Sequence, residues 1–237
     1  MAQENFKEMM QKPETKELMD MFFINFAKKE KTEKVRKYKS LNQYAKKGQI
    51  LFAGSSLMEQ FPINELQRNL ENQYTIYNRG IGGYVTTELL DSMEECIFEL
   101  APSKIFINIG TNDISLAGYK KENLISNYHK ILTQIGEKLP ECKVYVVAYY
   151  PVNAKDDFQG IDKGLKEIFF KTRTNANILE VNIDVEELAK KHGYEFINVN
   201  EGLMDKEGNL KEEYSIDGIH MFANGYSVIL NNLKKYL

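Results

Sequence analysis

A serine and a histidine with a nearby aspartate occur in this 237-residue chain at positions that suit nucleophilic chemistry. Ser56 comes shortly after the apolar run 50–53, and Asp217 precedes His220 by three residues near the C-terminus. A serine hydroxyl becomes a nucleophile when a base accepts its proton, and a third group must fix the tautomer of that base. Asp217 can reach His220 within one turn. These residue types suit covalent catalysis on a carbonyl carbon, although a serine in this position could also simply cap a helix.

The other two histidines are less suitable as a base. His129 falls inside a helical pattern, and His192 precedes Gly193 at the end of another, where a cation interacts favourably with the helix dipole. His220 instead lies in a loop before the last helical pattern. This loop could carry a catalytic residue, or it could be an ordinary surface turn. His220 is therefore the candidate base.

Glycines and a side-chain amide follow two further apolar runs. The stretch 80–83 reads Gly-Ile-Gly-Gly, and the stretch 110–113 reads Gly-Thr-Asn-Asp. The N–H of Gly83 could face a ligand, or the glycine pair could only form a tight turn. Asn112 and Asp113 are equally common as caps or turn residues. A complete Gly-x-Gly-x-x-Gly motif is absent here, so nucleotide binding is only weakly indicated.

Short apolar runs predict the strands that would carry these loops. The runs do not alternate with polar residues, which is typical of parallel strands buried on both faces, and they cover 50–53, 74–77, 105–109, 144–147 and 196–199. Helical patterns separate them, with ridges over 85–97, 124–135 and 222–233. This alternation predicts an α/β protein, a three-layer α/β/α flavodoxin-like sandwich around a five-stranded parallel sheet. Ligands bind such a sheet at the carboxyl ends of its strands, where the loops just described would meet.

The pattern of residues 1–47 predicts an N-terminal helical extension, which precedes a single domain of residues 48–237. They contain no glycine and are dense in Lys and Glu. Apolar residues recur there every third position, as on one side of a helix, at Val35, Tyr38, Leu41 and Tyr44. The segment 28–47 is locally basic, which favours a solvated helical face or an anchor for anionic lipid or a partner. It could also pack on the domain, or on another subunit in a homo-oligomer.

The composition excludes several classes of protein. Lys and Arg number 31 against 34 Asp and Glu, for a net charge of −3, which does not favour a nucleic-acid partner. Cys96 and Cys142 are the only cysteines, and they indicate neither a zinc site nor a disulfide framework. Residues 1–10 lack the apolar core of a signal peptide, and the run 21–24 is too short to span a bilayer. We therefore expect a cytoplasmic protein without an integral membrane span, a metal or an organic cofactor.

The four loop motifs together resemble those of the SGNH/GDSL hydrolases. The resemblance is to the bacterial branch similar to platelet-activating-factor acetylhydrolase subunits, and it covers residues 49–237. It rests on the order and approximate spacing of Gly-Ser-Ser-Leu at 54–57, Gly83, Gly-Thr-Asn-Asp at 110–113 and Asp-Gly-Ile-His at 217–220, with Gly225 and Tyr226 after them. One position departs from the family pattern, because Ser55 stands where the family has aspartate in Gly-Asp-Ser-Leu.

The resemblance implies a role for each matching residue. Ser56 would be the nucleophile, His220 the general base, and Asp217 the residue that orients His220. The backbone N–H groups of Ser56 and Gly83, with the side-chain amide of Asn112, would form the oxyanion hole. Ser55 leaves a minor rival nucleophile next to Ser56.

The resemblance implies a serine esterase or acylhydrolase that acts on carboxylic esters through an acyl-serine intermediate. The sequence has no visible lid-like apolar insertion, which favours short-chain, acetyl-type esters over long lipid chains. The substrate would be a small-molecule ester such as an acylated sugar or a lipid. Tyr84, Tyr149 and Met221 would border it, although aromatic residues beside strand ends often pack in the core instead. Arg79 and Arg173 could meet an anionic substrate. Two alternatives remain: an acyltransferase with the same triad, and a catalytically silent flavodoxin-like binding module.

Overall fold

The computed structural model describes residues 12–161 and 163–237. Its sheet has five strands, all parallel, in the order β2-β1-β3-β4-β5. The strands are β1 (Ile50–Gly54), β2 (Ile76–Asn78), β3 (Lys104–Asn108), β4 (Lys143–Val147) and β5 (Glu195–Ile197). This is the flavodoxin-like order, and it confirms the predicted fold class. The chain leaves β1 toward β2 on one side and returns to β3 on the other, so the loops after β1 and β3 diverge at a topological switch point.

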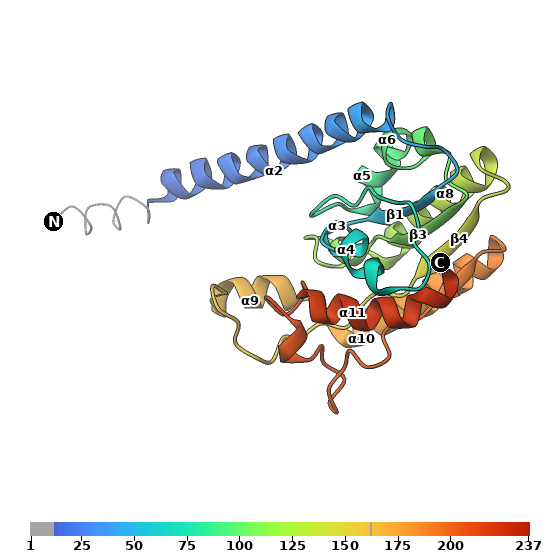
Figure 1. The fold of residues 1–237 in the computed structure, drawn as a ribbon. Helices are drawn as coiled ribbons and strands as arrows, with labels where there is room; N and C mark the ends of the chain where they lie inside the picture. The colour runs from blue at the N-terminus through green and yellow to red at the C-terminus, as the bar shows by residue number, and fades with distance from the viewer. Residues whose placement is uncertain (1–11, 162) are drawn as a thin grey trace.

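Helices cover both faces of the sheet, which explains why the strands are apolar throughout (Figure 1). In β1, Leu51 and Ala53 belong to one buried cluster, while Ile50 and Phe52 belong to the other. The first cluster is completed by residues of α5 (Thr86–Asp91), α6 (Met93–Cys96), α8 (Lys121–Lys138) and α10 (Asn175–Lys191). The second is completed by residues of α3 (Ser56–Glu59), α4 (Ile63–Leu66) and α11 (Ala223–Leu233).

The helical pattern predicted over 85–97 is two helices in the structure. The break is at Ser92, whose φ of −127° and ψ of 21° are not helical. Its hydroxyl donates to the carbonyl oxygen of Glu88 at 2.9 Å, a local bond of the kind that competes with helical structure. Two further short helices are α7 (Thr111–Ile114), which follows β3, and α9 (Lys163–Phe170), which lies between β4 and α10 in the chain.

The N-terminal segment forms α2 (Pro13–Asn42), a helix of 30 residues that begins with a proline in its first turn. Its N-terminal half extends away from the sheet (Figure 1). Of the predicted apolar stripe, Val35 and Tyr38 pack against the core, while Leu41 and Tyr44 are exposed. The division into an extension of residues 1–47 and a domain of residues 48–237 stays a prediction.

Within residues 12–161 and 163–237, no helix is both long and apolar enough to cross a membrane. The same residues contain no cluster of at least three His, Cys, Asp or Glu side chains suited to a metal ion. The prediction about a signal peptide concerns residues 1–10, which lie outside the described residues.

Candidate active site

The end of β1 turns sharply and places Ser56 at the start of α3. Gly54 makes this turn with φ of +152°, and a Cβ there would lie 2.0 Å from the carbonyl oxygen of Asn108 on β3. Only glycine allows the two strand ends to approach so closely. As the first residue of α3, Ser56 has a backbone N–H that no carbonyl within the helix accepts.

Ser56, His220 and Asp217 meet in a hydrogen-bonded series, although 164 residues separate Ser56 from His220. The Oγ of Ser56 lies 2.9 Å from Nε2 of His220. The other ring nitrogen of His220, Nδ1, lies 2.6 Å from Oδ2 of Asp217. The second carboxylate oxygen of Asp217 accepts the backbone N–H groups of Ile219 at 2.9 Å and His220 at 2.7 Å. This is the geometry in which an imidazole can take a proton from a serine hydroxyl.

The environment of Asp217 favours its ionised form. Burial by itself would raise the pKa of this half-buried carboxyl group. The hydrogen bonds from His220 and Ile219, together with the attraction of the imidazole, outweigh burial and hold the pKa of Asp217 below its ordinary value of 3.8. Asp217 therefore stays a carboxylate at neutral pH.

The loop that carries Asp217 and His220 is fixed by its own glycine and by a neighbouring segment. Gly218 has φ of +90°, and a Cβ there would lie 2.3 Å from the carbonyl oxygen of Asn153. The N–H of Asn153 donates to the carbonyl oxygen of Gly218 at 2.8 Å. The N–H of Gly218 in turn donates to Oγ of Ser215 at 2.7 Å. These contacts hold the imidazole at the carboxyl edge of the sheet.

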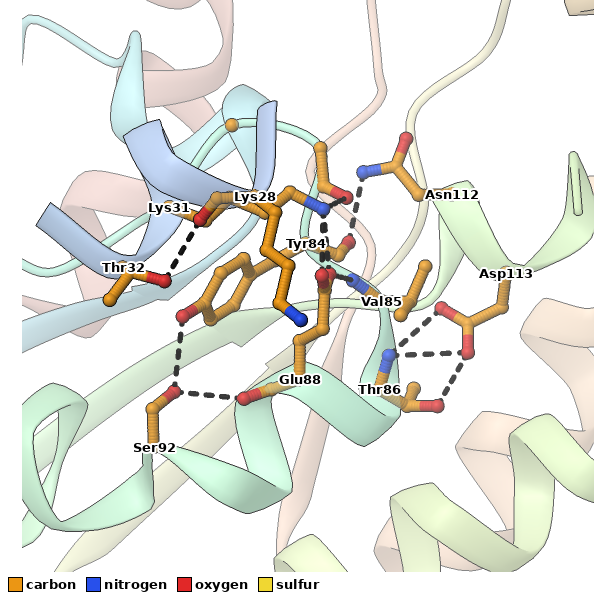
Figure 2. Close-up of polar contacts among 12 residues, drawn as sticks. Lys28, Lys31, Thr32, Tyr84, Val85, Thr86, Glu88, Ser92, Asn112 and Asp113 are labelled. Carbon is orange, nitrogen blue, oxygen red and sulfur yellow. Dashed lines mark hydrogen bonds and ion pairs between the residues drawn. The ribbon is translucent and has the colours of Figure 1, made fainter. Parts of the chain in front are cut away.

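The Gly82-Gly83 turn after β2 lies beside Ser56. A Cβ on Gly82 would be 4.0 Å from Cβ of Ser56, and Gly83 adopts a left-handed φ of +70°. Asn112, in α7 after β3, donates from Nδ2 to the carbonyl oxygen of Tyr84 at 2.9 Å (Figure 2). Ser56, Gly83 and Asn112 thus border one cavity.

Asp113 has a structural role, whereas its neighbour Asn112 borders the cavity. Its buried carboxylate accepts the backbone N–H of Thr86 at 3.0 Å and the hydroxyl of the same residue at 2.5 Å (Figure 2). Thr86 begins α5, so Asp113 caps that helix from a distant part of the chain.

Arg173, in the connection between α9 and α10, binds the oxygen of the Asn112 amide, whose nitrogen binds Tyr84. Arg173 is 7% exposed, and its Nη2 donates to Oδ1 of Asn112 at 2.6 Å. Burial lowers the pKa of Arg173 to about 10, while the nearby Asp217 carboxylate acts in the opposite direction. Arg173 is therefore still a cation at neutral pH. With its oxygen bound to Arg173, the amide of Asn112 presents Nδ2 as its donor.

The cavity beside these residues has a volume of about 570 Å³. Its lining includes Ser56, Asn112, Arg173, Asp217 and His220, with an apolar wall of Leu116, Ile168 and Phe169. Leu116, Ile168 and Phe169 are 51%, 66% and 38% exposed. No motif in the sequence indicates these three as site residues. For Ile168 and Phe169 the available signal is the short amphipathic pattern of α9.

The residues predicted to border the substrate do not line this cavity. Tyr84, Tyr149 and Met221 are 4%, 1% and 3% exposed and pack in the core. The hydroxyl of Tyr149 donates to the carbonyl oxygen of Ile109 at 2.7 Å. Contact of these three residues with a substrate stays a prediction. Arg79 is also buried and donates to Asn42 of α2 rather than facing the cavity.

The two adjacent serines differ in their surroundings. Ser55 is 1% exposed, and its Oγ has no hydrogen-bond partner among the described residues. Ser56 lines the cavity and is bonded to His220. The geometry thus favours Ser56 over Ser55 as the reactive hydroxyl, and Ser55 disturbs no contact of the series.

Residues 52–228 match the sequence model of the GDSL-like lipase/acylhydrolase family. The chain belongs to this family. A structure from Streptococcus pneumoniae, whose name refers to platelet activating factor, is 31% identical, with a TM-score of 0.81 over 92% of this chain and 98% of that one. A GDSL-like lipase from Bacteroides thetaiotaomicron shares the fold with a TM-score of 0.69 at 20% identity, over 85% of this chain and 96% of that one.

Curated relatives of this GDSL-family chain bear two kinds of name. An N-acylneuraminate cytidylyltransferase from Escherichia coli O18:K1:H7 is 27% identical over 220 residues, which are 89% of this chain and 47% of that protein. The platelet-activating factor acetylhydrolase IB subunit alpha1 of Bos taurus is 23% identical over 81% of this chain and 76% of that one. The chain thus spans about half the length of the E. coli cytidylyltransferase.

Proposed function

We propose that this protein is a carboxylic ester hydrolase whose nucleophile is Ser56. The observation that carries the proposal is the continuous series from Ser56 Oγ to His220 Nε2 at 2.9 Å and from His220 Nδ1 to Asp217 at 2.6 Å. Its position at the switch point of a parallel sheet, beside a cavity, is where ligands of this fold class bind.

In the first half-reaction, Oγ of Ser56 attacks the ester carbonyl carbon while Nε2 of His220 accepts the hydroxyl proton. The ionised Asp217 accepts a hydrogen bond from Nδ1–H of His220, so Nε2 carries no proton and acts as the base. The tetrahedral intermediate then collapses, the bond to the alkoxide breaks, and His220 returns the proton to the leaving oxygen. The product is an acyl group on Ser56 and a free alcohol.

The carbonyl oxygen becomes negatively charged during attack. The N–H groups of Ser56 and Gly83 and Nδ2 of Asn112 are donors that do not change charge, and they would bind this oxygen. Removal of one such donor costs about 10²–10³ in rate. Arg173 supports this arrangement because its bond to Oδ1 of Asn112 fixes the orientation of the amide. One N–H of Nδ2 binds the carbonyl oxygen of Tyr84, and the other would bind the oxyanion.

In the second half-reaction a water molecule replaces the alcohol. Nε2 of His220 accepts a proton from the water, whose oxygen attacks the acyl carbon. Collapse of this second intermediate breaks the bond between the acyl carbon and Oγ of Ser56, and His220 returns the proton to Oγ. A carboxylic acid is released, and Ser56 and His220 are restored.

The acyl group that we propose is short, of the acetyl type, on an acylated sugar or a lipid. The apolar wall consists of a few side chains at an open mouth, which suits a small acyl group better than a long chain. The name of one relative refers to an acetylhydrolase, which supports an acetyl ester, and the name of another refers to a sugar acid, N-acylneuraminate, whose hydroxyl groups are sites for such an ester.

A series of p-nitrophenyl esters tests this function and its acyl preference. We expect hydrolysis of the acetate, and kcat/KM about tenfold lower for the decanoate, a difference of about 1.4 kcal/mol. A groove for long acyl chains would instead gain about 0.8 kcal/mol for each buried CH₂, so a steady rise of kcat/KM with chain length contradicts the acetyl preference. The activity itself is excluded if none of the esters is cleaved.

The same assay with an added alcohol separates hydrolysis from acyl transfer. A hydrolase forms mainly acetate in the presence of the alcohol, and this is the result we expect. An acyltransferase forms mainly a new ester, and a catalytically silent module forms neither product.

A further inference from the structure

The C-terminal half of α2 contacts the turn that carries Gly82 and Gly83. The ammonium group of Lys31 donates to the carbonyl oxygen of Gly83 at 2.8 Å. One helical turn later, Lys34 forms an ion pair with Glu59 of α3, and Glu59 accepts the N–H of Gly82 at 2.5 Å. These lysines precede the segment 52–228 that matches the family.

We propose that α2 is a positioning element of the active site, in which Lys31 fixes the Gly82-Gly83 turn so that the N–H of Gly83 faces the oxyanion. This inference rests on the proposed function, because it assigns that N–H to the oxyanion hole. It gives the N-terminal helix a role in the reaction although no residue of α2 touches the reacting atoms.

The peptide group between Gly82 and Gly83 is the one that needs to be held. Two consecutive glycines have more backbone freedom than any other pair, and Gly83 already adopts a left-handed φ. The peptide before it is fixed where Glu59 accepts the N–H of Gly82. The peptide after it is fixed where Lys31 binds the carbonyl oxygen of Gly83. Its own N–H is therefore restrained from both sides, as a preorganised donor requires.

A third contact anchors the beginning of the same turn. The hydroxyl of Tyr38 donates to the carbonyl oxygen of Gly80 at 2.6 Å. Residues 31, 34 and 38 of α2 are spaced three and four apart, so they lie on one face of the helix. That face of α2 follows the turn from Gly80 to Gly83.

Lys31 would act by holding the turn in place and not through its positive charge, because the carboxylate of Glu88 compensates that charge. Both carboxylate oxygens of Glu88 lie within 2.9 Å of its ammonium group, and Glu88 also accepts the N–H of Val85 at 3.1 Å. The side chains of Lys31 and Glu88 are 23% and 36% exposed, and ion pairs so close to solvent contribute little to folding. Loss of the ammonium group should therefore leave a folded protein with a looser turn.

The test compares Lys31→Met with Lys37→Met in the full chain. Lys37 is exposed on the same helix and forms no hydrogen bond or ion pair with the turn in the part of the chain that the structure describes, so its variant controls for loss of a lysine. With p-nitrophenyl acetate we expect kcat of Lys31→Met to fall roughly tenfold at an unchanged KM, less than the ~10²–10³ loss for removal of an oxyanion donor. Lys37→Met should match the wild type, and Lys31→Arg should recover part of the lost kcat.

Hydrogen exchange reports on the turn without any substrate. Amides of residues 82–85 should exchange faster in Lys31→Met than in Lys37→Met, while strand amides should exchange at equal rates in both. Equal exchange at 82–85, or a kcat of Lys31→Met equal to that of the wild type, overturns the inference. So does a uniform rise in exchange across the chain, because Lys31 would then only stabilise the fold.

The wild type and Ser56→Ala separate failure of this inference from failure of the proposed function. If the wild type hydrolyses the ester, Ser56→Ala does not, and Lys31→Met equals the wild type, only the role of α2 is wrong. If Ser56→Ala is as active as the wild type, the proposed site is wrong and the role of α2 in it is overturned as well.

Discussion

Ser56→Ala is expected to lower kcat for p-nitrophenyl acetate by about 10⁴-fold or more, because no covalent intermediate can form without the hydroxyl. KM should change much less, since the cavity walls are untouched. The fold should remain intact, because Ser56 lies at the cavity rather than in the core. Steady-state kinetics with a thermal melt of each protein measures both effects.

Ser55→Ala is the matched control for this variant. Its hydroxyl is buried and has no partner among the described residues, so its removal leaves the series from Ser56 to Asp217 unchanged. We expect activity close to that of the wild type. If Ser55→Ala loses activity and Ser56→Ala retains it, the nucleophile is Ser55 and our assignment is wrong.

Asp217→Asn is expected to lower kcat by about 10⁴-fold while keeping the geometry of the loop. Asparagine can donate to Nδ1 of His220, which would place the proton on Nε2 and leave no base facing Ser56. The reduced activity should not recover at any pH between 5 and 8, because the tautomer and not the proton concentration is at fault. Asp184→Asn is the control, since Asp184 pairs with Lys121 on the surface.

The stability of Asp217→Asn should depend on pH in a defined direction. The pKa of Asp217 is below its ordinary value of 3.8 in the folded protein. A depressed carboxyl pKa contributes stability above the unfolded pKa, and this contribution is lost as the pH falls through the folded pKa. The wild type should therefore exceed Asp217→Asn in free energy of unfolding at pH 7, and the difference should shrink below pH 4. A difference that grows on acidification contradicts the assignment.

The strands could be predicted from the sequence, because helices cover both faces of the sheet and the buried strands are therefore continuous apolar runs. The resulting apolar runs, such as 105–109, ended within one or two residues of the observed strands. The break between α5 and α6 could not be predicted, because the ridge over 85–97 keeps its spacing across Ser92. A single side-chain bond to the carbonyl oxygen of Glu88 accompanies that break, and periodicity carries no information about it.

The position of the site could be predicted because ligands bind parallel sheets at the carboxyl ends of the strands. Whether each side chain there points into the cavity or into the core could not be predicted. Ser56 and His220 were named from the loops that contain them, and the structure brings them together. Tyr149 also follows a strand end, yet it points inward, because its hydroxyl binds Ile109 and packs where a Cβ of Gly110 would be. Tertiary packing decides between the cavity and the core for such aromatic residues.

The contacts of α2 show a further limit of sequence reasoning. A basic helical segment was predicted, and a solvated face was one of two interpretations of its charge. Lys31 pairs with Glu88, 57 residues away, and binds a backbone carbonyl that no composition analysis can locate. Only the fold shows that part of this charge faces the Gly82-Gly83 turn.

Covalent labelling with a fluorophosphonate tests the central claim most directly, because this reagent reacts with a serine hydroxyl only when a base activates it. Fragmentation of the labelled peptide by mass spectrometry distinguishes Ser55 from Ser56. We predict one phosphonate group on Ser56, at a rate that falls strongly in Asp217→Asn. Labelling of another residue, or no labelling of a folded wild-type protein, would contradict the claim that Ser56, His220 and Asp217 act as one unit.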